Sequence, residues 1–231
     1  MYEQQSHYLL NSILDQLRPE IRKRDLRHFY TRLGANFYAI YNLFQHLYGQ
    51  REDFRDQLQR LVSVMAAQYI ARDPALKALD SEREQDHLWF LDQQWVGMAL
   101  YLDGFAGNLT GVGDKLPYLQ ELGVNLVHIM PILECPPGAS DGGYAVSDYR
   151  NINARSGNLQ ELEGLAADLR RRQMLLTLDV VVNHTSDQHE WARRARRGEQ
   201  AYQDYYYIFE NRDIPDLFEE SLPEIFPETA P

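Results

Sequence analysis

The sequence predicts an α/β protein in which an N-terminal all-helical domain precedes the first three βα units of a truncated (β/α)8 TIM barrel. Up to about residue 90, apolar side chains recur at helical spacing and strand-like runs are scarce. From residue 91 onward, short apolar runs alternate with amphipathic helical stretches. That alternation is typical of a parallel sheet whose strands are joined by helices.

The helical region is defined by two apolar stripes and one capping signal. Asp73 followed by Pro74 suits an N-cap with proline at the first helical position, so another helix is predicted to begin there. We interpret the stripes as packing surfaces, with an aromatic ligand groove as the alternative. Their members are Phe37, Ile40, Tyr41, Phe44, Leu47 and Tyr48, and then Leu58, Leu61, Val62, Met65 and Tyr69.

Three strands and two helices are predicted in the second region. The strands cover residues 95–102, 124–131 and 174–182, and Gly123 is placed to end the first helix, over residues 112–122. A long connection after the second strand runs to about Gly157 and precedes the second helix. The apolar faces of the two helices are Val112, Leu116 and Leu119, and then Leu159, Leu162, Ala166 and Leu169.

Such a βαβαβ unit can begin either a doubly wound nucleotide-binding sheet or a barrel, and the loops favour the barrel. The stretch GNLTGVGDK after the first strand matches neither phosphate-binding glycine motif. The loop after the second strand is far longer than usual, and barrel enzymes place their sites on such loops at the carboxyl ends of the strands.

Composition excludes several classes of function. The chain has 231 residues and a net charge of -11, which would repel a nucleic-acid backbone. One local basic run is interpreted as a solvated helix face; it consists of Arg193, Arg194, Arg196 and Arg197. A single cysteine, Cys135, allows no internal disulfide, and neither a signal peptide nor a membrane-spanning run is present. We expect a cytoplasmic protein that binds neither nucleic acid nor membrane.

An acid interrupts the third predicted strand. In LDVVVNH, Asp179 stands inside a β-branched run, where a lone carboxylate costs several kcal/mol unless a partner pairs with it. We therefore expect a partner or a function for Asp179.

The long loop contains SDGGYAVSDYRNIN, which combines Asp141, a glycine pair and Tyr144. Two glycines permit a tight turn, which would project Asp141 and Tyr144 toward a common point. An aromatic face beside a carboxylate suits a sugar, whose C–H faces stack on rings and whose hydroxyls bond to acids. The alternative is an Asp-Gly turn followed by a packed tyrosine.

These motifs also resemble a known family. DVVVNH, at residues 179–184, resembles the first signature region of the alpha-amylase superfamily. The surrounding stretches resemble the amylosucrase family within it, and the helical region before residue 90 does so too. The stretches are YLDGFAGNLTGVGDKLPYLQELGV, HIMPILECPPGASDGGYAVSDYRNIN, NHTSDQHEWARRA and YYYIFENRDIPDLFEESLPEIFP.

The resemblance implies a retaining glucosyltransferase that takes glucose from sucrose and adds it to an α-1,4-glucan through a covalent glucosyl-enzyme. By the same resemblance, His184 would bind the transferred glucose, Tyr144 would stack on its ring, and Asp141 would close the pocket by pairing with an arginine. Asp179 would be a structural acid beneath the site, and Asn183 would lie beside it. No cofactor is implied, and no metal is expected, although some relatives hold calcium through the asparagine of the Asn-His pair.

The resemblance also places the nucleophile, the acid/base glutamate and a third aspartate after later strands, so no catalytic residue is expected in this chain. We expect residues 1–90 to form the helical domain, 91–182 the first part of the barrel, and 183–231 the start of an inserted B domain. The chain alone is then predicted to be inactive.

Three alternatives remain open at this point. The chain could belong to a sucrose hydrolase or another glucosidase of the superfamily. It could be a non-catalytic protein whose helical half is an interaction module. A metal hydrolase using His184, His189 and Glu190 is disfavoured, because no H-E-x-x-H helix or cysteine pair is present.

Overall fold

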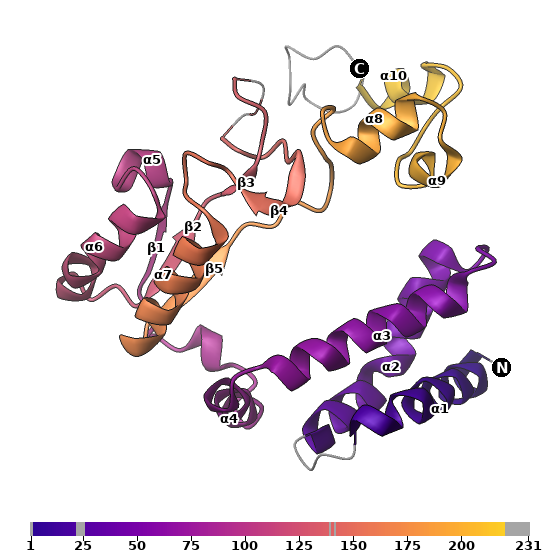
Figure 1. The fold of residues 1–231 in the computed structure, drawn as a ribbon, viewed down its shortest axis with the longest axis horizontal. Coiled ribbons are helices and arrows are strands. Elements are labelled where there is room, and N and C mark those ends of the chain that lie inside the picture. Colours follow the sequence, from indigo (N-terminus) through magenta and orange to yellow (C-terminus); the bar gives the residue numbers. More distant parts are fainter. Residues whose placement is uncertain (1, 22–25, 139, 141, 220–231) are drawn as a thin grey trace. The chain divides into compact units, whose positions relative to one another are not determined.

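The computed structural model describes residues 2–21, 26–138, 140 and 142–219 (Figure 1). Its internal contacts divide the chain into two units, Met1–Trp89 and Phe90–Pro231, and each is described by itself. The finer division predicted from the sequence, with boundaries after residues 90 and 182, stays a prediction. None of the described helices is long and apolar enough to cross a membrane.

The first unit is helical, with α1 (Tyr2–Ile21), α2 (Arg27–Tyr48) and α3 (Phe54–Ala71) packed on one another and α4 (Pro74–Arg83) following. The predicted stripes form part of its core, in which Phe37, Tyr41, Leu58 and Val62 are buried. Three predicted stripe members are exposed instead, namely Leu47, Tyr48 and Leu61. The stripes were drawn too wide, because a helix buries only the face that its neighbours cover.

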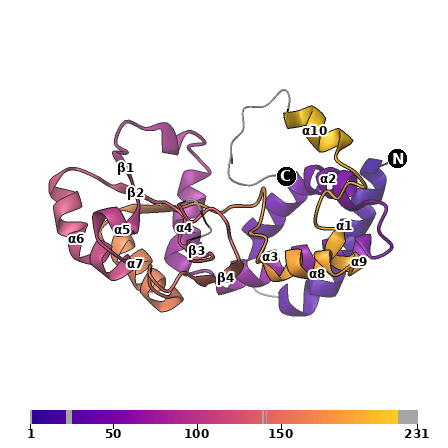
Figure 2. The same cartoon turned by 90° about the horizontal axis from the view of Figure 1, so that it is seen from above.

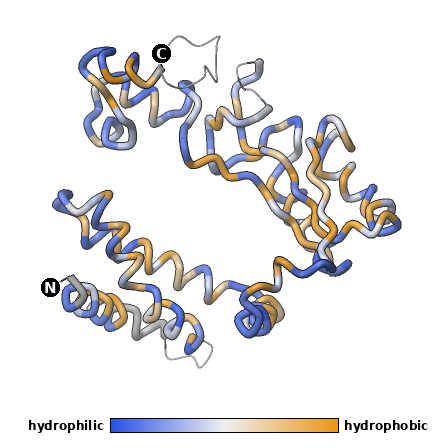
Figure 3. The backbone as a smooth tube through the Cα atoms, turned by 180° about the vertical axis from the view of Figure 1, so that it is seen from behind, coloured by the Kyte–Doolittle hydropathy of each residue, from blue (hydrophilic) through white to orange (hydrophobic). Residues whose placement is uncertain are grey.

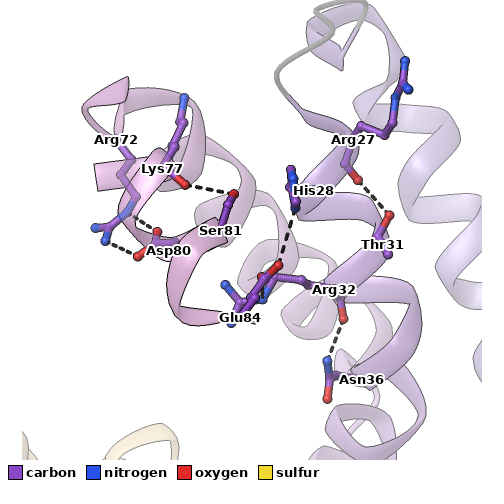
Figure 4. Close-up of polar contacts among 10 residues, drawn as sticks. All are labelled: Arg27, His28, Thr31, Arg32, Asn36, Arg72, Lys77, Asp80, Ser81 and Glu84. Atoms are coloured by element: carbon purple, nitrogen blue, oxygen red, sulfur yellow. Dashed lines mark hydrogen bonds and ion pairs between the residues drawn. The ribbon is translucent and has the colours of Figure 1, made fainter. Parts of the chain in front are cut away.

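Helix α4 is held by its N-cap and by ion pairs, and the ion pairs are drawn in Figure 4. The Asp73 carboxylate accepts a hydrogen bond from the Ala75 amide at 2.8 Å, which confirms the predicted N-cap. Asp80 receives two hydrogen bonds from the Arg72 guanidinium, at 2.7 and 2.9 Å. Glu84 at the helix end pairs with Arg32 of α2, 3.0 Å from its Nε. Paired charges on both sides therefore tie α4 to the ends of α2 and α3.

The second unit contains a parallel sheet in the order β1-β2-β5, with β1 (Gly97–Leu100), β2 (Leu126–Ile129) and β5 (Leu175–Leu178). Residues Ala99, His128 and Thr177 lie side by side in register. The connections hold α5 (Leu102–Phe105), α6 (Leu109–Glu121) and α7 (Leu159–Arg171). This is the predicted succession of βα units.

Helices α6 and α7 lie side by side along the sheet and cover one of its faces (Figures 1 and 2). The predicted face of α6 is confirmed, since all three of its members are buried. On α7, Leu159 is exposed and Leu165 takes its place beside Leu169 in the core. The buried cluster includes Leu100, Val112, Leu116, Leu119, Val127, Ile129, Leu165 and Leu169.

Side-chain caps define where both helices begin. Asn108 accepts from the Gly111 amide at the start of α6. At the start of α7, Asn158 and Glu161 form a reciprocal capping box, in which each side chain accepts from the other's backbone amide. The positive φ of Gly123, 79°, confirms its predicted place just after α6.

The strands are shorter than predicted. β1 ends at Leu100, because α5 begins at Leu102, and β5 ends at Leu178 instead of continuing to residue 182. Val180 and Val182 are 64% and 85% exposed. The four residues of β2 pair with four residues on each side, and Val180 and Val182 lie beyond this ladder. Figure 3 shows the hydrophobic character of the parallel strands against the mixed character of the helices.

The long connection after β2 holds a second, antiparallel sheet that the sequence did not predict. β3 (Leu133–Glu134) pairs with β4 (Asp148–Ile152), with an irregularity in register between Leu133 and Glu134. Between β5 and residue 219, where the described part of the chain ends, lie three short helices: α8 (Glu190–Arg196), α9 (Gln200–Gln203) and α10 (Asp213–Glu219). The pairing of β3 with β4 holds residues 148–152, near the end of the long connection, against residues 133–134 at its start.

The core of the second unit yields a prediction about stability. Leu119 of α6 is 0% exposed, whereas Leu122, one turn later, is 54% exposed. Leu119→Ala should lower the free energy of unfolding by about 2 to 5 kcal/mol, because it leaves a cavity in the core. The matched change Leu122→Ala should cost less than about 1 kcal/mol. Urea unfolding measures both, and equal losses would contradict the proposed core.

Candidate functional site

The site is built at the carboxyl ends of the parallel strands. His128 of β2 pairs in register with Thr177 of β5, and Asp179 follows Thr177 by two residues. Because alternate residues along extended chain point to the same face, His128 and Asp179 share one face. It is the face opposite Val127 and Ile129, which pack against the helices. Sheet geometry alone thus brings an imidazole and a carboxylate together.

Asp179 uses both carboxylate oxygens. His128 Nε2 lies 2.8 Å from Oδ1, and the Tyr144 hydroxyl donates to Oδ2 at 2.8 Å. These two hydrogen bonds, from His128 first and from Tyr144 second, lower the pKa of Asp179. The carboxylate is therefore held ionised with both oxygens occupied, so it suits holding its neighbours in place rather than attacking a substrate.

Tyr144 is fixed by the same contact. The hydrogen bond to Asp179, together with burial and the carboxylate charge, raises the pKa of Tyr144 to about 12. Its phenol stays protonated at neutral pH and continues to donate. Tyr101, two residues beyond Ala99 of β1, is the further neighbour that raises this pKa.

His184 lies beside Tyr144. Its Nε2 is 3.2 Å from the Tyr144 carbonyl oxygen, and the side-chain nitrogen Nδ2 of Asn183 is 3.4 Å from its Nδ1. Both contacts suit the tautomer in which Nε2 carries the proton and donates. Asn183 and His184 are exposed, and the structure therefore brings Tyr144, Asp179, Asn183 and His184 into one neighbourhood. Their roles toward a substrate stay predictions.

Asp141, the remaining predicted site residue, lies outside the described residues. The glycines after it have positive φ, 56° at Gly142 and 90° at Gly143, as the tight turn required. A Cβ at Gly142 would lie 3.1 Å from the Tyr101 hydroxyl, and one at Gly143 would lie 3.1 Å from the Pro131 carbonyl oxygen. This turn thus needs glycine for both conformation and space.

Sequence reasoning missed two residues of this neighbourhood. His128 is a polar residue within an apolar strand, and this was the signal that could have identified it as the partner of Asp179. Tyr149, in β4, donates through its hydroxyl to the carbonyl oxygens of Val181 and His184, at 2.6 and 3.1 Å. No local pattern marks Tyr149, because its contacts lie more than thirty residues away.

An aromatic cluster supports the turn that holds His184. Tyr149 stacks on Trp191 of α8 with ring centroids 5.9 Å apart, and His189 and Tyr205 contact the same indole. His189 is only 5% exposed, and its Nδ1 accepts from the Trp191 amide at 3.0 Å, which caps α8. Burial lowers the pKa of His189.

Within the part of the chain that the structure describes, no three His, Cys, Asp or Glu side chains are arranged to hold a metal ion. The described side chains of the site can act on a ligand by hydrogen bonding. An ionised acid, a phenol held as a donor and an exposed imidazole can orient hydroxyl groups.

The contact between Asp179 and Tyr144 predicts a shift in tyrosine ionisation. Asp179→Asn removes the negative charge that opposes formation of a phenolate, so the pKa of Tyr144 should fall from about 12 toward the ordinary value. Carbon-13 NMR of the ring carbon that carries the hydroxyl, followed across pH, measures it. The ring signal of Tyr118 on α6 is the control and should be the same in both proteins; an unchanged Tyr144 would argue against the contact.

The capping contact of His189 predicts a dependence of stability on pH. Its pKa is lower in the folded chain than in the unfolded chain, so folding favours neutral His189. That stabilisation is fully present above the unfolded value of about 6.5 and is lost as the pH falls through the folded pKa. His189→Asn keeps an oxygen acceptor for the Trp191 amide without titrating. Unfolding midpoints should therefore depend less on pH below about 6.5 in this variant, and an equal dependence would refute the assignment.

Comparison with known proteins gives relatives for part of the chain. An alpha-glucosidase of Schizosaccharomyces pombe is 46% identical over 94 residues, which are 41% of this chain and 16% of that protein. An oligo-1,6-glucosidase of Bacillus cereus is 40% identical over 101 residues, covering 43% of this chain and 18% of the relative. The chain thus spans about a fifth of the length of the curated relatives that it matches.

Among solved structures, the trehalulose synthase MutB from Pseudomonas mesoacidophila MX-45 is 33% identical, with a TM-score of 0.47. The overlap covers 52% of this chain and 23% of that one.

The alpha-amylase catalytic domain matches residues 47–228. That match takes in most of the chain, including all three parallel strands and the neighbourhood of Asp179. The chain therefore belongs to the alpha-amylase family and contains part of its catalytic domain.

Proposed function

We propose that this chain contributes the sugar-binding part of a retaining, amylosucrase-like glucosyltransferase, which moves glucose from sucrose to an α-1,4-glucan. The observation that carries the proposal is the meeting of Tyr144 and His184 at the carboxyl ends of β2 and β5. In a (β/α)8 barrel, that end of the sheet is where substrates bind. The family assignment and the motif resemblance support the choice of a glucose unit as the ligand.

The proposed roles follow from what each side chain can donate or accept. His184 Nε2–H can donate to a hydroxyl of the transferred glucose, and Tyr144 presents its ring to the sugar while Asp179 holds its hydroxyl. Asp141 would close the pocket by pairing with an arginine. Asp179, held by His128, fixes the base of the site, and Asn183 orients the His184 ring.

The reaction itself would need two further carboxyl groups, one as nucleophile and one as acid and then base. We place both on strands that follow β5 in the family's barrel. The chain by itself is then expected to bind sugar without turning it over. No cofactor enters this scheme.

A second candidate is a glucosidase that hydrolyses α-1,6-linked glucosides. It is favoured by the names of several relatives, which are oligo-1,6-glucosidases at 38 to 40% identity over about a hundred residues. Both candidates use the same retaining chemistry on a terminal glucose. They differ in the leaving group and in whether a sugar or water accepts the glucose.

Product analysis distinguishes the two, in a protein that joins this chain to the rest of its catalytic domain. Fructose release from sucrose with growth of a glucan supports the transferase, whereas glucose release from isomaltose alone supports the hydrolase.

His184→Ala should reduce kcat/KM by about 10- to 150-fold, or about 1.5 to 3 kcal/mol, if His184 bonds the sugar where charge develops. A change below about twofold would leave His184 a packing residue. Clear turnover of sucrose by the 231-residue chain alone would refute the placement of the carboxyl groups.

A further inference from the structure

We propose that Tyr149 is a positioning residue, whose hydroxyl holds the turn at residues 181–184 so that the His184 imidazole faces Tyr144. This inference rests on the proposed function for its consequence in catalysis, but not for its geometry. The turn follows β5, and Tyr149 comes from β4 of the separate antiparallel sheet. The contact therefore joins two connections that lead away from neighbouring strands.

The hydroxyl reaches both ends of the turn. Its oxygen lies 2.6 Å from the Val181 carbonyl oxygen and 3.1 Å from that of His184. One proton is shared between two acceptors, with the shorter contact at Val181. Because the contacts are to backbone atoms, they constrain the path of the chain itself, and the path sets where the exposed His184 ring points.

Two other contacts fix the same connections without reaching this turn. The Ser186 amide donates to the Val146 carbonyl oxygen at 2.8 Å, and the Thr185 hydroxyl lies 2.9 Å from that of Tyr206. Both hold the chain just after His184. On the other side, Val180 and Val182 are exposed and outside the strand ladder. The Tyr149 hydroxyl thus bonds the carbonyl oxygens of Val181 and His184, the residues that flank Val182 and Asn183 in the turn.

The ring of Tyr149 is placed by the aromatic cluster and not by its hydroxyl. It stacks on Trp191 at an interplanar angle of 30° and contacts His189 with centroids 5.6 Å apart. Tyr149→Phe therefore removes the tether while leaving the stack in place. This separation allows positioning to be tested apart from packing.

The first test uses NMR of the 231-residue chain, which needs no turnover. The His184 ring signals are assigned by their absence in His184→Ala. Tyr149→Phe should shift these signals and speed amide exchange at residues 182–184 by about 10-fold, because a hydrogen bond that held the turn is lost. Tyr206→Phe, the matched loss of a neighbouring hydroxyl, should change them far less. Unchanged His184 signals in Tyr149→Phe, or equal effects of both variants, would overturn the inference.

A second measurement does not depend on any variant. In the unaltered chain, nuclear Overhauser contacts should join the ring protons of Tyr149 to residues 181–184, and their absence would overturn the inference.

A third measurement is kinetic. In the protein with its whole catalytic domain, Tyr149→Phe should lower kcat/KM for sucrose by about 10- to 100-fold with little change in melting temperature. If the His184 signals move while this rate does not, the tether stands and the proposed role of His184 fails.

Discussion

The organisation of this site depends on a single carboxylate at the end of β5. A charge beside a parallel sheet is tolerated only when donors surround it, and Asp179 has one donor from the adjacent strand and one from a distant loop. The two hydrogen bonds to Asp179 therefore also fix the positions of the His128 and Tyr144 side chains. The imidazole of His128 connects the acid to the sheet, and the phenol of Tyr144 connects it to the long connection after β2.

From this acid the contacts spread outward in two directions. Tyr144 leads through its own carbonyl to His184, and Tyr149 leads from the antiparallel hairpin back to the backbone before and at His184. The aromatic stack on Trp191 extends the same support to α8. Among the described residues, Tyr144 and His184 are therefore joined to both sheets by hydrogen bonds and ring contacts, although the connections that carry them contain little regular structure.

The sequence was informative where the physical signal is local. The face of α6 and the Asp73 cap follow from neighbours a few residues away, and both were predicted correctly. Strand ends depend on partners elsewhere in the chain, so the β-branched run after Leu178 was mistaken for more strand. The contact between His128 and Asp179 spans 51 residues. Each is a polar residue in or beside an apolar strand, which marks both residues, but the sequence alone does not fix which residue pairs with which. Asp179 and Tyr144 were singled out from the residues around them, whereas the role of His184 and the proposed functions of all three came from resemblance to a family.

The β3–β4 hairpin has a consequence for how such a protein can vary. Its pairing, together with the hydrogen bond from the Ser147 amide to the Glu134 carbonyl oxygen, closes the base of the segment between those two residues. Length changes within that segment would be absorbed at its tip, because the base keeps Tyr149 in register with the chain beside β5. The length of that segment can therefore differ between related chains without loss of the Tyr149 contacts to the turn after β5.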